Sequence, residues 1–158
     1  MVAALADGLG HGPMAEEASL AFCEYVKAHP TDDLEDIIRD AGTAIAKTRG
    51  VAAAVVRIDL EKQSISFAGI GNIELQSVSK QPIRPVCTPG IIGRPLRKVV
   101  QFDYELNLGD LLAMYSDGIS SRFSLSEYRY NEVQAVADTI LANHGKAHDD
   151  ATCIVFRF

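Results

Sequence analysis

The sequence lacks the features of disulfide-stapled, membrane-spanning and nucleic-acid-binding proteins. Its three cysteines are widely spaced and form no C-x-x-C pair, which leaves zinc ribbons and dithiol redox motifs without support. No stretch is apolar for long enough to cross a bilayer, and no basic segment precedes the first apolar run as in a signal peptide. The net charge of -6 argues against nucleic acid and anionic membranes as partners. We therefore expect a cytoplasmic protein with reduced cysteines.

The composition is that of a globular protein. Of the 158 residues, 47% are hydrophobic and 23% are charged, values that fit one domain over residues 1–158 with a substantial core. Apolar residues at helical spacing predict a helix from Pro13 to the His29-Pro30 pair, which ends it. A second helix is predicted from Asp32, which with Glu35 resembles a capping box, to a point near Gly50.

Strand patterns occupy the start and the middle of the chain. A short apolar run precedes the first helix, a hairpin and a further strand follow the second, and two more strands come after a Pro/Gly-rich connection. A third helix and a last strand complete the order. The predicted ranges are strands at 2–6, 51–60, 64–68, 73–77, 100–106, 110–115 and 151–158, the connection at 81–97 and the third helix at 133–141. Helices at both ends of an antiparallel block predict an α+β fold with layered sheets, and not a doubly wound one.

Three aspartates are predicted to lie at strand ends. Asp7 follows the first strand, Asp117 follows the strand at 110–115, and Asp149 precedes the last strand. If the last strand runs antiparallel to the other two, the three carboxylates arrive at one edge of the sheet. Clustered carboxylates must protonate or recruit a cation, and Mg²⁺ and Mn²⁺ prefer oxygen ligands. A lone aspartate beside glycine usually forms a turn, but three of them joined to strands favour a metal site.

Such a site suits phosphoryl hydrolysis. Gly8 allows close backbone approach, and its carbonyl offers a further oxygen ligand. Two ions that share a water molecule would lower its pKa and offset the charge of the phosphoryl oxygens. The resulting hydroxide attacks phosphorus in line, so no protein nucleophile is required. Asp7, Asp117 and Asp149 are therefore the predicted catalytic residues, acting through a metal-activated water.

Other site types fit the sequence less well. The glycines after Asp7 follow a strand and precede a helix, but Pro13 stands where a dinucleotide fingerprint needs its last glycine, and no Walker G-K-[ST] is present. A calcium loop starting at Asp7 would place Leu9 and His11 at ligand positions. No nucleophile elbow supports Ser-His-Asp hydrolysis, and the cysteines lack the C-x5-R pattern of cysteine phosphatases.

Four motifs occur in series along the chain and carry a family resemblance. They are Ala6-Asp7-Gly8-Leu9-Gly10-His11-Gly12, Gly69-Ile70-Gly71-Asn72, Tyr115-Ser116-Asp117-Gly118-Ile119 and Asp149-Asp150-Ala151-Thr152. In this order they resemble the metal-dependent serine/threonine protein phosphatases of the 2C type, and in particular the bacterial branch of stage II sporulation protein E and RsbX-like phosphatases. The resemblance covers essentially the whole chain.

The resemblance implies a four-layer α/β/β/α sandwich with two central antiparallel sheets and two Mn²⁺ or Mg²⁺ ions between the sheets at one end. Asp7 would bridge both ions, the Gly8 carbonyl would join one, and Asp117 and Asp149 would hold the other. Asp150 and Gly118 are expected beside these ligands and not among them. Relatives carry a further strand with another acidic residue before the Asp-Gly motif, so the N-terminal strand is expected to be truncated.

The implied function is hydrolysis of phosphoserine or phosphothreonine on a regulatory protein in stress or sigma-factor signalling. Substrates of the RsbX-like group are phosphorylated stressosome or anti-sigma-antagonist proteins. Eukaryotic relatives place a candidate general acid, a histidine, where this chain has Leu9, so that role does not carry over. His11 is either a catalytic residue or an ordinary loop histidine. The alternative function is a module that keeps the fold and binds a phosphoprotein with little or no turnover.

Overall fold

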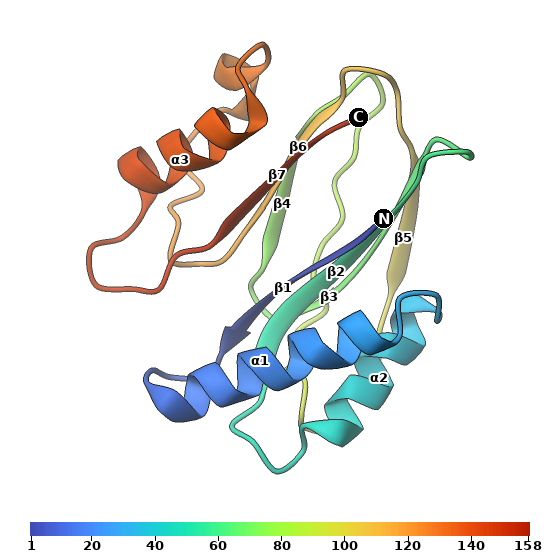
Figure 1. Cartoon of the computed structure of the whole chain (residues 1–158), viewed down its shortest axis with the longest axis vertical. Helices are drawn as coiled ribbons and strands as arrows, with labels where there is room; N and C mark the ends of the chain where they lie inside the picture. Colours follow the sequence, from blue (N-terminus) through green and yellow to red (C-terminus); the bar gives the residue numbers. More distant parts are fainter.

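A computed structural model of residues 1–158 shows two antiparallel sheets packed face to face, with helices on both outer sides (Figure 1). The first sheet has the strand order β1-β2-β3-β5, and the second has the order β4-β6-β7. The strands of the first sheet are β1 (Val2–Gly8), β2 (Val51–Asp59), β3 (Ser64–Ile70) and β5 (Gln101–Glu105). Those of the second are β4 (Glu74–Val78), β6 (Leu111–Tyr115) and β7 (Cys153–Arg157).

The helices cover the outer faces of the two sheets (Figure 1). Helices α1 (Pro13–Ala28) and α2 (Leu34–Ala44) pack on the first sheet, while α3 (Val133–His144) and the short 3-10 helix η1 (Leu125–Tyr128) pack on the second. The predicted α/β/β/α order of layers is therefore confirmed. No helix in the structure is long and apolar enough to span a bilayer.

Three hydrophobic clusters separate the four layers, and side-chain alternation on β1 shows how. Val2, Ala4 and Ala6 pack in the cluster beneath α1 and α2, whereas Ala3 and Leu5 belong to the cluster between the sheets. Because successive side chains of a strand point to opposite faces, the next residue in the inward series is Asp7. The alternation of β1 thus directs this carboxylate toward the second sheet.

The second helix departs from its predicted bounds at both ends. Its N-cap is Asp33, not Asp32: the Asp33 carboxylate accepts a hydrogen bond of 2.9 Å from the N–H of Glu35. The helix ends at Ala44, before the predicted end near Gly50. Turn-type hydrogen bonds close residues 45–50 instead, because the Thr48 hydroxyl donates to a backbone carbonyl and accepts from the N–H of Gly50.

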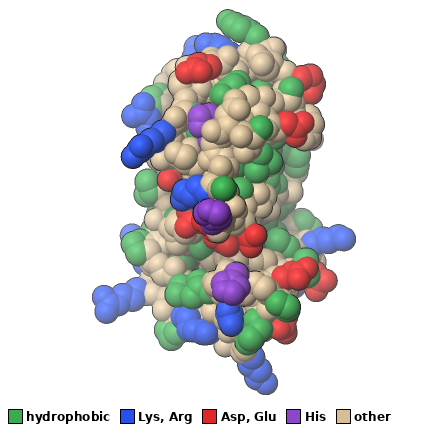
Figure 2. All heavy atoms as spheres, turned by 90° about the vertical axis from the view of Figure 1, so that its left-hand side faces the viewer, with side chains coloured by type: hydrophobic (Ala, Val, Ile, Leu, Met, Phe, Trp, Pro, Cys, Tyr) green, Lys and Arg blue, Asp and Glu red, His purple; other side chains and the backbone are tan.

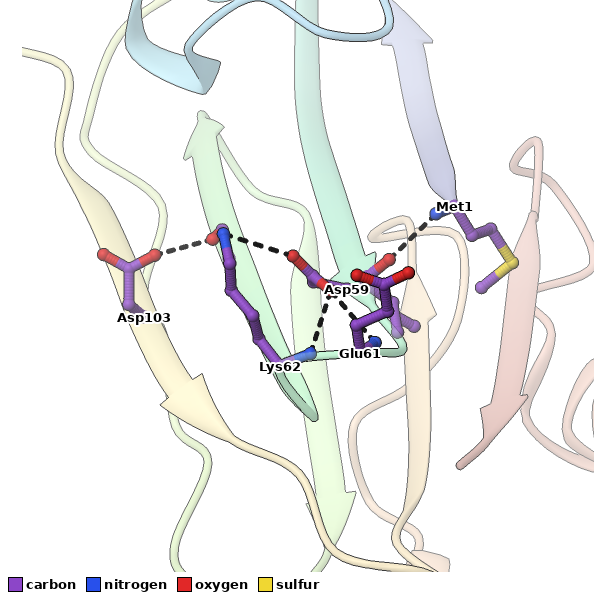
Figure 3. A network of polar contacts seen from close by, with 7 residues as sticks. Met1, Asp59, Glu61, Lys62 and Asp103 are labelled. Carbon is purple, nitrogen blue, oxygen red and sulfur yellow. Dashed lines mark hydrogen bonds and ion pairs between the residues drawn. The ribbon is translucent and has the colours of Figure 1, made fainter.

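The predicted hairpin between β2 and β3 is confirmed, and a polar network holds its turn (Figure 3). The Asp59 carboxylate accepts hydrogen bonds from the N–H groups of Glu61 and Lys62 at 3.1 and 3.0 Å and forms an ion pair of 3.4 Å with the Lys62 ammonium. Beside it, the N-terminal ammonium of Met1 donates to the carbonyl of Ile58 at 2.8 Å. The Met1–Ile58 contact holds the pairing of β1 with β2 at the end opposite to Asp7.

Candidate metal centre

The predicted aspartates line one pocket of about 500 Å³ at the ends of the two sheets. Figure 2 shows acidic side chains gathered in the middle of this face, with histidine and basic side chains on either side of them. The residues that line the pocket are Asp7, Gly8, Leu9, Gly10, His11, Ala52, Asn72, Asp117, Ala147, His148, Asp149 and Asp150. The expectation that all three acids share one sheet edge was wrong, because β1 belongs to one sheet and β6 and β7 to the other. They meet across the gap between the sheets.

Asp7 was expected just beyond the end of the first strand, but it lies within β1. Antiparallel pairing with β2 continues through Asp7, opposite Ala52, to Gly8, opposite Val51. The pKa of Asp7 is raised to about 6, chiefly by burial. The charge of Asp117 and a hydrogen bond with its carboxyl group are the next causes. Asp149 and Asp150 add to this rise through their charges alone. The pocket therefore holds more negative charge than its own residues neutralise.

Two glycines allow the backbone segments of the pocket to approach closely. A Cβ atom at Gly8 would lie 2.1 Å from the carbonyl oxygen of Ala15 in α1, and a Cβ atom at Gly118 would lie 2.1 Å from the carbonyl oxygen of Asp150. Neither position has room for a side chain. Gly8 thus seats the end of β1 against α1, and Gly118 seats the segment after Asp117 against the loop that carries Asp149 and Asp150.

Hydrogen bonds join that loop to the segment after β6. The N–H of Ser116 donates to the carbonyl of Thr152 at 3.1 Å, and the N–H of Thr152 donates to the Ser116 hydroxyl at 3.1 Å. Strand β7 runs antiparallel to β6, as predicted, so the start of β7 lies beside the end of β6. Asp149 and Asp117 reach the same pocket because these two strand ends are joined.

Asn72 is a site residue that the sequence reasoning did not single out. Its side-chain amide donates a hydrogen bond of 2.6 Å to Oδ2 of Asp117, and it also lines the pocket. The Lys146 ammonium donates to the backbone carbonyl of Asp117. The Gly69-Ile70-Gly71-Asn72 motif was visible in the sequence, but the partner of Asn72 lies 45 residues away along the chain. Only the fold reveals which carboxylate Asn72 orients.

The donor set fits a hard divalent ion in its chemistry. Four carboxylates and nearby backbone carbonyls are all oxygen donors, the type that Mg²⁺ and Mn²⁺ prefer. As the side chains stand, no three Asp, Glu, His or Cys groups converge closely enough to hold an ion. Asp149 and Asp150 are exposed, and Oδ1 of Asp149 accepts a hydrogen bond from the N–H of Asp150. Burial and then the neighbouring acids raise the pKa of Asp7, and a bound cation would offset the charge of those acids. Which residues bind the cation stays a prediction.

Comparison with known proteins places the chain in a family. All residues from 1 to 158 match the family model of stage II sporulation protein E. The chain belongs to the stage II sporulation protein E family. The chain is also 25% identical over 158 residues to the phosphoserine phosphatase RsbX of Bacillus subtilis (strain 168). The match covers 98% of this chain and 79% of RsbX.

Solved structures agree with this family assignment. A structure described as "The bacterial stressosome: a modular system that has been adapted to control secondary messenger signaling" superposes with a TM-score of 0.92 at 28% identity, over 98% of this chain and 83% of its own. RsbX in complex with magnesium gives a TM-score of 0.87 at 25% identity, over 98% and 79%. The Mycobacterium tuberculosis serine/threonine phosphatase PstP/Ppp, at 20% identity and a TM-score of 0.76 over 98% and 86%, shares the fold.

Three sequence-based predictions are thereby confirmed. The resemblance to metal-dependent protein phosphatases of the 2C type was correct, the α+β sandwich was correct, and the enzyme class is that of a serine/threonine protein phosphatase. In this stage II sporulation protein E-family enzyme the pocket of Asp7, Asp117 and Asp149 is the candidate centre. Whether His11, which also lines the pocket, takes part in catalysis stays a prediction.

Proposed function

We propose that this enzyme removes phosphate from phosphoserine or phosphothreonine on a regulatory protein of stress or sigma-factor signalling, at the pocket of Asp7, Asp117 and Asp149. The observation that carries the proposal is the convergence of carboxylates from a strand of one sheet and from two segments of the other into one pocket. That convergence raises the pKa of Asp7 to about 6 through burial and the neighbouring acids. Carboxylates held in this way are suited to binding cations.

The cofactor in this proposal is Mn²⁺ or Mg²⁺, as two ions. Asp7, the carbonyl of Gly8, Asp117 and Asp149 would hold them, with Asp150 and Gly118 beside the ligands. When bound, such ions lower the pKa of a water molecule and offset negative charge on phosphoryl oxygens. That RsbX has been solved with magnesium supports this choice of cofactor.

The chain's own residues orient the carboxylates. The Asn72 amide donates a hydrogen bond to Oδ2 of Asp117, which restricts rotation of the Asp117 side chain. The bond leaves Oδ1 of Asp117 available to a ligand. Gly118 keeps the Asp149-Asp150 loop against the segment after β6, because any side chain would meet the Asp150 carbonyl. Together these contacts hold groups from distant parts of the sequence in place before substrate arrives, which is how positioning lowers a barrier.

The proposed substrate is a phosphorylated protein of the stressosome or anti-sigma-antagonist type. RsbX is a phosphoserine phosphatase, and another similar structure is that of a stressosome system, which supports this class of partner. We assign the activity to the single domain of residues 1–158. We also propose a cytoplasmic location for the enzyme, the one expected from its sequence.

The test is manganese-dependent hydrolysis of a chromogenic aryl phosphate and of a phosphoserine peptide. We expect turnover that requires Mn²⁺ and that falls about 100-fold or more in Asp7→Asn and Asp117→Asn, since each removes a charged ligand. Asp138→Asn, on the exposed side of α3, is the matched control and should retain wild-type activity. Calorimetric titration should show weaker Mn²⁺ binding to Asp117→Asn with the fold intact.

Two results would contradict the proposal. Turnover that is unaffected by chelation, or that persists in both Asp7→Asn and Asp117→Asn, would remove the metal centre from the mechanism. An inactive wild-type chain that still binds the phosphopeptide in the presence of Mn²⁺ would favour the phosphoprotein-binding module instead.

A further inference from the structure

A basic side chain lies at the rim of the acidic pocket. Arg49 is exposed, and its guanidinium lies over Gly10: a Cβ atom built on Gly10 would be 2.7 Å from Nη1 of Arg49. Gly10 lines the pocket and has a φ of 87°, a conformation that favours glycine. The absence of a side chain at Gly10 is what lets Arg49 lie there, at the rim of the pocket and not among its lining residues.

The turn that carries Arg49 is held from two sides. Arg94 donates from Nη2 to the carbonyls of Thr48 and Arg49, at 3.2 and 3.3 Å. From the pocket side, the N–H of Leu9 donates to the carbonyl of Gly50 at 3.0 Å. The backbone of Arg49 is therefore tied both to the loop of Arg94 and to the loop that follows Asp7.

A groove of about 380 Å³ continues from this turn along α2. It is lined by Arg39, Gly42, Thr43, Ala46, Gly93, Arg94, Pro95 and Leu96. Arg94 belongs both to the groove and to the contacts that hold Arg49, so Arg49, Arg94 and Arg39 follow one another away from the pocket. We call these three residues the arginine track.

The arginine track is electrostatically unbalanced within the molecule. The chain has a net charge of -6, yet its one ion pair joins Lys62 and Asp59 at the hairpin. On α2, the Glu35 carboxylate accepts a hydrogen bond from the N–H of Gln101, and Asp36, one turn before Arg39, forms no ion pair with it. Burial, followed by the charge of Asp40, raises the pKa of Tyr25 in α1, so Asp40 lies near that ring. No carboxylate of the protein is within ion-pairing distance of the track.

We propose that the arginine track binds an acidic segment of the substrate protein that flanks the phosphorylated residue. The inference rests on the proposed function, because the same pocket would take the phosphoryl group while the flanking residues cross the rim at Arg49. The Arg94 guanidinium already donates to the carbonyls of four residues, so it contributes positive charge and holds the turn. The Arg49 guanidinium makes no such bond, and a guanidinium binds a carboxylate with two parallel hydrogen bonds while opposite charges favour encounter. Arg49 thus discriminates between substrates without touching the reacting atoms.

The experiment compares two phosphoserine peptides of equal length. One carries Asp and Glu on both sides of the phosphoserine, and the other carries Asn and Gln at the same positions. In the Mn²⁺-loaded wild type we expect kcat/KM to favour the acidic peptide about tenfold, a preference that shrinks at high salt. Arg49→Ala should reduce the preference to within about twofold, and Arg49→Glu should reverse it. Arg84→Ala is the control, because Arg84 is an exposed arginine away from the pocket. The preceding residue, Ile83, accepts a hydrogen bond from the hydroxyl of Ser77 near the end of β4.

The outcomes separate this inference from the function on which it rests. A wild type with no preference, or an Arg49→Ala variant that keeps it, overturns the track. An equal loss of activity toward both peptides in Arg49→Ala also overturns it, because Arg49 would then act on the phosphoryl group or the fold. If the wild type hydrolyses nothing, fluorescence anisotropy of the labelled peptides decides: tighter binding of the acidic peptide that Arg49→Ala abolishes supports the track, and equal binding refutes it.

Discussion

Replacing Gly118 by alanine tests the candidate centre without removing any of its ligands. The added Cβ atom would lie 2.1 Å from the Asp150 carbonyl oxygen, 2.7 Å from its carbon and 3.1 Å from the Cα atom of Ala151. An ordinary contact needs about 3.4 Å, so the Asp149-Asp150 loop must retreat from Asp117 by about 1 Å. All three neighbours are backbone atoms, so no side chain can rotate aside to relieve the clash.

A displacement of this size is large for a site that depends on position. Misplacement by about 1 Å can cost about 100-fold in rate, and disturbed orientation of metal ligands about 10- to 100-fold in affinity. We therefore expect Gly118→Ala to weaken Mn²⁺ binding about 10- to 100-fold in calorimetric titration and to lower kcat/KM for an aryl phosphate about 100-fold. Gly42→Ala is the control, because its Cβ atom would meet nothing closer than 3.5 Å.

The refuting result is specific. If Gly118→Ala is folded by circular dichroism and binds Mn²⁺ with wild-type affinity, then the approach of the Asp149-Asp150 loop to Asp117 does not build the centre. Loss of Mn²⁺ affinity in Gly42→Ala to the same extent would show that the assay reports general destabilisation instead.

Three further predictions follow from individual contacts. Asn72→Ala, which removes the 2.6 Å hydrogen bond to Asp117, should weaken Mn²⁺ binding about tenfold by calorimetry, and unchanged affinity would contradict the orienting role. The pKa of Asp7 rises from 3.8 to about 6 on folding, chiefly through burial, so the metal-free folded state binds this proton more tightly than the unfolded state. The stability of the metal-free protein in urea should therefore fall as pH rises from about 4 to 6, less so in Asp7→Asn, whereas Mn²⁺ affinity should rise through the same range. Phe67→Ala, at a site with 1% exposure between the sheets, should lower the free energy of unfolding by about 3–5 kcal/mol, whereas Leu60→Ala, at 68% exposure, should change it by less than about 0.5 kcal/mol.

Local pattern was sufficient for most of the elements. Pro13 begins α1 as predicted, and the alternation around Phe67 and across 100–106 identified strands, because helical and strand periodicities depend only on neighbours in the chain. Element ends were less predictable where distant groups decide them. Helix α2 ends at Ala44 partly because Arg94, far along the chain, takes the carbonyls of the following turn.

The sequence by itself determined the residue types of the centre and the order of their motifs, from which the family could be inferred. It did not determine that Asp7 lies in one sheet and Asp117 follows a strand of the other, that Asn72 donates a hydrogen bond to Asp117, or that Arg49 lies over Gly10. These are contacts between segments that have no local periodicity in common. They exist because the two sheets bury their apolar faces against each other, which brings the ends of β1 and β6 together and gathers charges that no stretch of sequence holds side by side.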